Sequence, residues 1–212
     1  MICNLCPRRC GVERTPDKAA GVCAMPAWPV AARAMLHQWE EPCLVGERGA
    51  GAVFFSGCNL RCKFCQNGVI SQEGYGKPIT PRRLREIFEE LVEQGAACLD
   101  LVTPTHFTDA VLEALGEERW PVPVVWNCGG YESVETLKRL EGRVQVYLPD
   151  LKYALSEPAA RYSAAADYPQ VARAAILEMY RQTGPFRLDE DGMLQRGVLI
   201  RHLILPQQGE NT

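Results

Sequence analysis

Residues 52–65 read AVFFSGCNLRCKFC, an apolar run that leads directly into three closely spaced cysteines. The thiols of Cys58, Cys62 and Cys65 follow the spacing C-x3-C-x2-C. An iron–sulfur cube takes four ligands, and cysteine thiolates are its usual protein donors. Three clustered thiolates therefore hold three irons and leave the fourth open, as a catalytic zinc site keeps one position open. The apolar strand before the loop and Phe64 within it favour this interpretation over a zinc site lacking one ligand or packed free cysteines.

The composition is that of a single globular domain whose ten cysteines indicate metal binding or catalysis. A chain of 212 residues can bury most of its apolar surface. Its net charge of -3 gives no reason to expect nucleic acid as the main partner. No stretch approaches the roughly 20 apolar residues that span a membrane, and the N-terminus lacks the apolar core of a signal peptide. We therefore expect a cytoplasmic protein, in whose reducing compartment cysteines serve metals or chemistry rather than disulfides.

Residues 1–30 form a separate cysteine-rich segment with little hydrophobic periodicity. Because such a segment cannot build an apolar core, we expect metal binding to supply its order. Four thiolates suit zinc in a tetrahedral site or a second [4Fe–4S] cluster. Cys43 is an alternative fourth ligand, and free thiols in a disordered tail are the alternative to any metal. The predicted ligands of this second metal site are Cys3, Cys6, Cys10 and Cys23.

After the cysteine loop, apolar runs alternate with segments of helical periodicity. Thr80 and Pro81 suit the start of a helix, and Gly95 suits its end. Continuous apolar strands that alternate with helices favour a parallel sheet covered on both faces. We therefore predict an α/β fold, a partial (β/α) barrel over residues 31–212. Its strands are expected at 52–55, 96–102, 122–126, 144–148 and 197–205, and its helices from about residues 81, 108, 134 and 158, the last with a restart near 167–169.

Polar and small residues follow the predicted strands, at the end where the chemistry of such a barrel gathers. A zwitterion with a ribose needs a cation for its carboxylate, oxygens for its amine, and Asn or Asp for its hydroxyls. The alternatives are a simple ion pair between Asp150 and Lys152, and a His106 that caps a helix or satisfies a loop carbonyl. The candidate residues are Thr103, Thr105, His106, Asn127, Asp150, Lys152 and Arg201.

Other prominent residues receive structural interpretations. We expect Trp39 and Cys128 to be packing residues. Glu40 and Glu41 are interpreted as a solvated pair, and residues 189–192 as an exposed acidic turn. The glycines at 129 and 130 would let the backbone approach a ligand closely.

The cysteine loop, together with Asp150-Leu151-Lys152 and with Ile200-Arg201 followed by Pro206, resembles the pattern of radical S-adenosylmethionine (radical SAM) enzymes. Residues 50–205 are similar to the activating enzymes of glycyl-radical proteins, the pyruvate formate-lyase activating enzyme type. The whole chain resembles an uncharacterised homologous branch of that type. The resemblance implies SAM on the open iron of a [4Fe–4S] cluster. It also implies that Asp150 touches a monovalent cation, and that SAM is surrounded by Asn127, Asp150, Lys152 and Arg201.

Three features depart from that family. Pro104-Thr105-His106 stands where the family has Gly-Gly-Glu, so Thr103 or Thr105 oxygens would hold the SAM amine. The cysteine-rich N-terminus is absent from the well-known activating enzymes, which leaves the partner protein open. The chain ends just after the fifth strand, so we expect a barrel that lacks its last strand and has an open edge, in a truncated or a shortened homologue.

Together these observations predict an enzyme that reductively cleaves SAM and abstracts hydrogen through a 5′-deoxyadenosyl radical. By resemblance, the substrate is a glycine Cα–H in a partner protein, and a low-potential donor supplies the electron. The alternatives are a radical SAM modifier of another peptide or a small molecule, and an iron–sulfur electron carrier that never cleaves SAM. Release of 5′-deoxyadenosine distinguishes the enzymes from the carrier.

Overall fold

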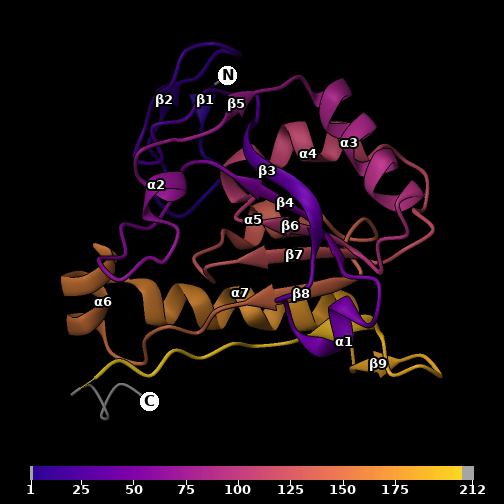
Figure 1. The fold of residues 1–212 in the computed structure, drawn as a ribbon. Helices are drawn as coiled ribbons and strands as arrows, with labels where there is room; N and C mark the ends of the chain where they lie inside the picture. Colours follow the sequence, from indigo (N-terminus) through magenta and orange to yellow (C-terminus); the bar gives the residue numbers. More distant parts are fainter. Residues whose placement is uncertain (1, 207–212) are drawn as a thin grey trace.

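A mixed sheet of eight strands runs through the computed structural model, which describes residues 2–206 (Figure 1). The strand order is β5-β3-β4-β6-β7-β8-β10-β9, and these strands do not close into a barrel. The predicted α/β class and the parallel core of the sheet are therefore confirmed. Five neighbouring strands are parallel: β4 (Ala50–Phe55), β6 (Leu99–Val102), β7 (Val124–Cys128), β8 (Val146–Pro149) and β10 (Leu194–Val198).

Both edges of the parallel sheet carry antiparallel strands. β3 (Val30–His37) pairs with β4 and with the short β5 (Lys77–Pro78). At the other edge, β9 (Arg187–Leu188) pairs with β10. The edge that was expected to be open is therefore covered by a short strand, a common way to protect a sheet edge.

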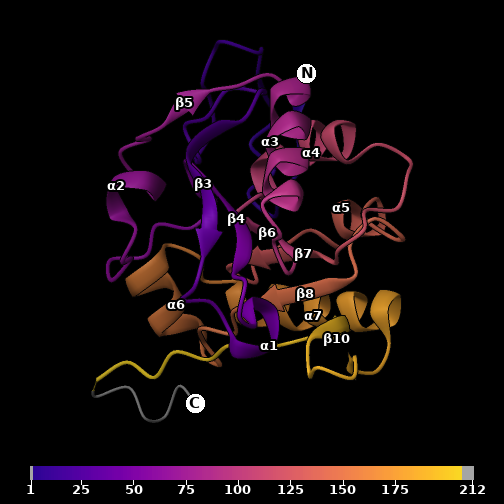
Figure 2. The same cartoon turned by 45° about the vertical axis from the view of Figure 1, so that its right-hand side comes forward.

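Helices cover one face of the sheet (Figure 2). α3 (Pro81–Glu93) begins as predicted, because the Thr80 hydroxyl accepts a hydrogen bond from the Arg83 amide at 3.1 Å and Pro81 occupies the first turn. Leu84, Phe88 and Leu91 bury its apolar stripe in the main core. The same core takes side chains from α4 (Thr108–Leu115), α5 (Val134–Lys138) and α7 (Tyr168–Thr183).

The opposite face of the sheet is apolar at one end and polar at the other. The short helix α1 (Pro42–Val45) packs Leu44 and Val45 against Val125 and Val146 at the apolar end. Side chains two residues apart on a strand point to the same face of the sheet. Asp100 follows Cys98 by two residues and Asn127 follows Val125 by two residues, and both Cys98 and Val125 pack on the face that α1 covers. Asp100 and Asn127 therefore face that side as well. This leaves a polar region near the carboxyl ends of the strands.

The remaining elements lie at that end of the sheet. The arrows of β7 and β8 point toward the side of the molecule that carries α2 (Gly68–Ser71) and α6 (Ser156–Ser163) (Figure 1). A 3₁₀ turn, η1 (Thr105–Phe107), follows β6. The N-terminal segment adds a two-stranded ribbon of β1 (Ile2–Cys3) and β2 (Val12–Glu13). None of the helices within residues 2–206 is long and apolar enough to cross a membrane.

The predicted elements differ from the structure in position. The helical stretch over 158–183 is broken as expected, into α6 and α7. The fifth strand is β10 rather than 197–205, and beyond Val198 the chain stays extended, with a single bridge between Asp150 and Arg201. Ile204 is 68% exposed, so the apolar residues beyond Val198 do not form the buried strand that their composition suggested. Trp39 is 90% exposed, and its expected packing role is wrong.

Candidate active site

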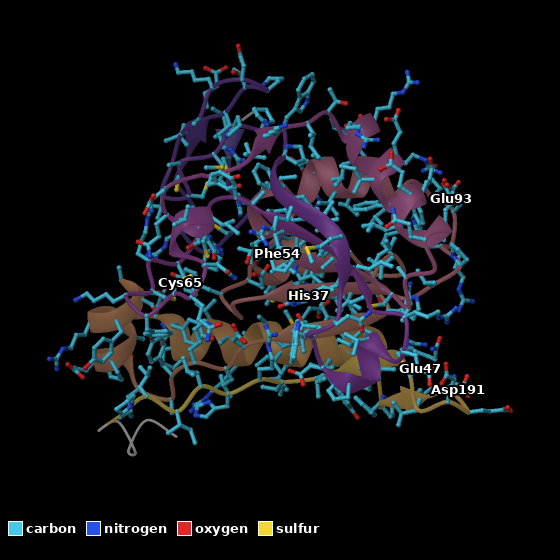
Figure 3. The ribbon with its side chains drawn as sticks, in the orientation of Figure 1. His37, Glu47, Phe54, Cys65, Glu93 and Asp191 are labelled. Atoms are coloured by element: carbon cyan, nitrogen blue, oxygen red, sulfur yellow. The ribbon has the colours of Figure 1, made fainter. Side chains whose placement is uncertain are left out.

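The cysteine loop follows β4 directly, at the carboxyl end of the first parallel strand. Each of its thiols forms a hydrogen bond. The Leu60 amide donates to the Cys58 sulfur (3.4 Å), and the Ser163 hydroxyl donates to the Cys62 sulfur (2.9 Å). The Cys65 sulfur lies 3.2 Å from the Ser71 hydroxyl of α2. Figure 3 shows Cys65 on the side of the molecule that carries α2 and α6. Hydrogen bonds to sulfur of this kind tune iron–sulfur clusters.

The donor set of the loop fits a cluster better than a single metal ion. Within residues 2–206, no group of three His, Cys, Asp or Glu side chains is placed to hold one ion. A cube needs no such convergence, because each thiolate binds a different iron. Burial raises the pKa of Cys58 to about 12, while the positive charge of Lys152 acts in the opposite direction. A cationic metal core would remove that penalty, because it stabilises the thiolate.

The strand-end residues form one hydrogen-bonded network. The Lys152 ammonium lies 2.6 Å from one Asp150 carboxylate oxygen, and the Arg201 guanidinium lies 3.1 Å from the other. Arg201 also donates to the Asn127 side-chain oxygen at 2.7 Å. The structure therefore brings together four of the seven residues that the sequence singled out: Asn127, Asp150, Lys152 and Arg201.

Glu40 completes this network, although the sequence suggested a solvated carboxylate. Its side chain is only 10% exposed and lies 3.0 Å from the Arg201 guanidinium. The Asn127 amide donates to its second oxygen at 2.9 Å. The solvated interpretation is wrong for Glu40, because the segment before α1 turns back across the polar face of the sheet.

Asp100 is a second carboxyl group that the sequence analysis missed. It is fully buried on β6, and the Asn127 amide lies 3.4 Å from one of its oxygens. Its other oxygen has no hydrogen-bond partner among the described residues. Burial, and then the nearby charge of Glu40, raise the pKa of Asp100 well above its usual range. Asp100 therefore lies directly behind Asn127, beside the network that joins Glu40 and Asp150 to Arg201 and Lys152.

The side chains of the other three candidates form no hydrogen bond with this network among the described residues, although the Thr103 amide donates to the Asn127 carbonyl oxygen at 2.8 Å. Thr103 ends β6 with a left-handed backbone, φ 60°. Thr105 is buried and donates to the Glu132 carboxylate at 2.6 Å. His106 is also buried, with its Nε2 2.7 Å from the Ser56 carbonyl oxygen, so the alternative that it satisfies a loop carbonyl is confirmed. Burial lowers the pKa of His106 to about 3, which keeps it neutral. Their expected contact with an amine stays a prediction.

A tyrosine and a glycine pair fix the loops after β7 and β8. The Tyr168 hydroxyl lies 2.9 Å from the Gly129 carbonyl oxygen and 2.7 Å from that of Asp150, and it accepts from the Lys152 amide at 3.0 Å. Gly130 has φ +77°, and a Cβ there would overlap the Asp150 carbonyl oxygen. The close backbone approach expected at these glycines is therefore made by the protein itself. Cys128 is buried, as the packing interpretation requires.

An α/β sheet with a cysteine loop at the end of its first parallel strand, and a charged network beside it, is the arrangement expected of an α/β protein whose site lies at the carboxyl ends of its strands. The comparison with known families is more specific. Residues 52–149 match the Radical SAM superfamily and form a radical SAM domain. This region runs from β4 to the end of β8 and includes the cysteine loop. A radical SAM domain indicates an enzyme and implies a [4Fe–4S] cluster and SAM.

One relative is an uncharacterised protein of Methanocaldococcus jannaschii, which is 30% identical over 213 residues. The alignment covers 96% of this chain and 57% of that protein. The chain therefore spans less than two thirds of the length of the curated relative it matches. The similarity extends the relationship beyond the radical SAM domain into the N-terminal segment, and it adds no activity or substrate.

Proposed function

We propose that this protein cleaves SAM at a [4Fe–4S] cluster bound by Cys58, Cys62 and Cys65, with SAM held by the strand-end network. The observation that carries the proposal is the position of Lys152. A Cβ at Gly129 would lie 3.0 Å from the Leu60 side chain, which belongs to the cysteine loop, and 3.8 Å from the Lys152 Cε, so Lys152 lies beside the cysteine loop. Its ammonium is paired with Asp150. Lys152 thus links the cysteine loop to the charged network.

The charges of the network complement those of SAM. SAM carries an ammonium, a carboxylate and a sulfonium, so it needs cations and anions within one site. Arg201 and Lys152 suit the carboxylate, and the carboxylates of Glu40 and Asp150 suit the cationic groups. Asn127 offers both a donor and an acceptor to ribose hydroxyls. In the same proposal, Asp150 is the carboxylate that would contact a monovalent cation.

When bound and reduced, the cluster supplies the electron that splits SAM into methionine and a 5′-deoxyadenosyl radical, which abstracts hydrogen from the substrate. In this proposal, the residues of this chain bind SAM, orient it toward the cluster and shield it from water. Tyr168 and Gly130 hold the loops of β7 and β8 in place, and the buried Asp100 supports Asn127 from behind. A low-potential external donor is required to reduce the cluster.

For the substrate, we propose a partner protein from which the enzyme abstracts a glycine Cα hydrogen. The support is the likeness of the cysteine loop and of Asp150-Leu151-Lys152 to glycyl-radical activating enzymes. Another peptide or a small molecule is the alternative, favoured by the cysteine-rich N-terminus.

The activity is tested by anaerobic reconstitution, reduction with dithionite and addition of SAM, followed by mass spectrometry of 5′-deoxyadenosine. We expect release by the wild type and none by the triple variant Cys58→Ala, Cys62→Ala, Cys65→Ala. Cys43→Ala, which removes a thiol packed beside α1, is the matched control and should retain release. If the cluster-loaded wild type releases none, the protein is an electron carrier and the proposal fails.

A further inference from the structure

The four cysteines of the N-terminal segment are brought to one place. Cys3, Cys6, Cys10 and Cys23 all line a single cavity. β1 and β2 pair through Cys3 and Val12. Between them the chain turns, with the Arg9 amide donating to the Cys6 carbonyl oxygen at 3.0 Å, and this turn places Cys10 in the same cavity. Three of these side chains, those of Cys3, Cys6 and Cys23, are buried. The segment is thus ordered around its thiols rather than around an apolar core.

Cys43 does not belong to this group. Its side chain packs with Leu44 beside Val125 and Val146, on the sheet face that α1 covers. The N-terminal cavity is instead lined by His106, which follows β6 at the carboxyl end of the sheet. The alternative of Cys43 as a fourth ligand is therefore wrong, and the ligand set consists of the four N-terminal thiols.

Hydrogen-bond donors already point at two of these sulfurs. The Val22 amide donates to the Cys10 sulfur at 3.5 Å, and the Arg14 guanidinium donates to the Cys3 sulfur at 3.3 Å. Arg14 is 1% exposed, so this cation is buried against the thiols. The guanidinium also donates to the Met25 carbonyl oxygen at 3.0 Å and to the His106 carbonyl oxygen at 2.8 Å. These bonds hold it beside the Cys3 sulfur, and hydrogen bonds to ligand sulfurs are a feature of iron–sulfur sites.

The donor set matches a cube. A [4Fe–4S] cluster takes one thiolate per iron, and four thiols line this one cavity. Hydrogen-bond donors to ligand sulfurs, as at Cys3 and Cys10, are also a feature of such clusters. A tetrahedral zinc ion is the other occupant for four thiolates and is an outcome of the test below. We infer that Cys3, Cys6, Cys10 and Cys23 bind a second [4Fe–4S] cluster, one with all four irons ligated by the protein.

This second cluster lies beside the first cysteine loop. Gly57, which precedes Cys58, packs so closely on the N-terminal segment that a Cβ there would lie 2.9 Å from the Cys23 carbonyl oxygen. Arg8 donates to the Asn59 carbonyl at 2.8 Å, and Arg61 donates to the Val22 carbonyl. The two sets of thiols are therefore carried by segments in direct contact. The inference stands on these contacts and is independent of SAM cleavage.

Iron and sulfide analysis of anaerobically reconstituted protein tests the inference. Since each cube holds four irons, we expect about eight irons and eight sulfides per wild-type chain. The double variant Cys6→Ala, Cys23→Ala and the triple variant of Cys58, Cys62 and Cys65 should each retain about four. Cys43→Ala is the matched control and should retain about eight. Mössbauer spectra of the triple variant should show only cube irons with complete thiolate ligation.

The iron and sulfide content of the wild type is measured without any substitution, so a misfolded variant cannot produce the expected value. A wild type with about four irons, or with one zinc that the Cys6/Cys23 variant loses, would overturn the inference. So would a Cys6/Cys23 variant that keeps about eight irons. Neither outcome depends on 5′-deoxyadenosine release, so a failed SAM assay leaves this test unaffected.

Discussion

Single charged side chains at the strand ends decide what the site can bind. Lys152 pairs with Asp150, and Arg201 pairs with both Asp150 and Glu40. Asn127 donates a hydrogen bond to Glu40 and accepts one from Arg201. Removing one member leaves its partner in a mostly buried region without its counter-charge. Such a loss is felt in ligand affinity, because a charge-assisted hydrogen bond contributes about 1.5–3 kcal/mol.

Lys152→Ala should weaken SAM binding by about tenfold to a hundredfold, because the substitution removes the cation proposed to face the SAM carboxylate. Iron content should stay at the wild-type level. The dissociation constant is measured by anaerobic equilibrium dialysis with labelled SAM. Lys138→Ala, the same substitution at an exposed position of α5, serves as control. Equal affinity in the Lys152 and Lys138 variants would show that SAM binds elsewhere.

Glu132 adds a pH dependence to the stability of the fold. It is buried against Thr105, and burial raises its pKa to about 7. A carboxyl whose pKa is raised in the folded state contributes stability below its unfolded pKa of 4.5, and that stability is lost as the pH rises to about 7. The wild type should therefore lose on the order of 2 kcal/mol through this group between about pH 5.5 and pH 8.

Glu132→Gln keeps an acceptor for the Thr105 hydroxyl and removes the ionisation. The Tm of the variant relative to the wild type should therefore be higher at pH 8 than at pH 5.5, by roughly 4–8 °C. Anaerobic scanning calorimetry of both proteins at both pH values gives this double difference. An identical Tm difference at the two pH values would show that Glu132 does not titrate in this range.

At the residue scale, the sequence predicted the cysteine loop and the four members of the network that follow strands. These could be found because position after a strand places a side chain at the active end of a parallel sheet. Glu40, Asp100 and Glu132 were missed for a physical reason. Their roles depend on which segment folds over the polar face and on which side of a strand a carboxyl points, and local patterns report neither.

Elements defined by local chemistry were predictable. The Thr80 cap of α3 and the break between α6 and α7 follow from side chains that act within one turn. The length of β3 was not predictable, because its pairing with β4 and β5 is decided by residues distant in sequence. For the same reason, the fifth strand was placed too late by its apolar composition.

Gly130→Ala should be strongly destabilising, because the loop between β7 and α5 carries a left-handed backbone pressed against β8. A Cβ at this position meets the Asp150 carbonyl oxygen in addition to the strain of φ +77°. Gly142→Ala is the matched control: its φ is +81°, but nothing lies within 4 Å of the added Cβ. We expect a loss of about 1 kcal/mol in the control and of several kcal/mol in Gly130→Ala.

Thermal unfolding of the two glycine variants, with SAM affinity as a second readout, checks this prediction. The control should keep wild-type affinity, whereas Gly130→Ala should lose it, because the Asp150 backbone must move. Equal Tm values for the two variants would mean that the loop accommodates the added Cβ without loss of stability, and that Gly130 does not position Asp150.

Over the whole molecule, the sheet order could be predicted only in its central part. Consecutive strands β4, β6, β7, β8 and β10 are neighbours, as parallel connections usually arrange them. The antiparallel additions at both edges, and the docking of the N-terminal segment on the carboxyl end of the sheet, rest on long-range contacts. The division at residue 30 into two units remains a prediction.

Metal removal should release the N-terminal segment while the sheet stays folded. Arg14 is buried against the thiols, so trypsin can cut after it only when the segment opens. We expect cleavage after Arg14 to accelerate at least tenfold once a chelator has removed the iron. Mass spectrometry of timed digests gives the rate, and cleavage after Arg82, which is exposed on α3, is the internal control.

The same digest in the triple variant of Cys58, Cys62 and Cys65 isolates the N-terminal metal. Protection of Arg14 should persist in that variant and vanish on chelation. If the bond after Arg14 is cut at one rate with and without iron, the metal does not order this segment.

The contacts of the N-terminal segment also constrain the order in which the protein can be assembled on the ribosome. Arg14 bonds to the carbonyl of His106, and Arg8 bonds to the carbonyl of Ala164, 156 residues further along the chain. At about 5–20 residues per second, the thiols are synthesised on the order of ten seconds before the surface that receives them. Their site can therefore be completed only after α6 has been made. A segment that is made early is thus held in place by parts of the chain that are made later.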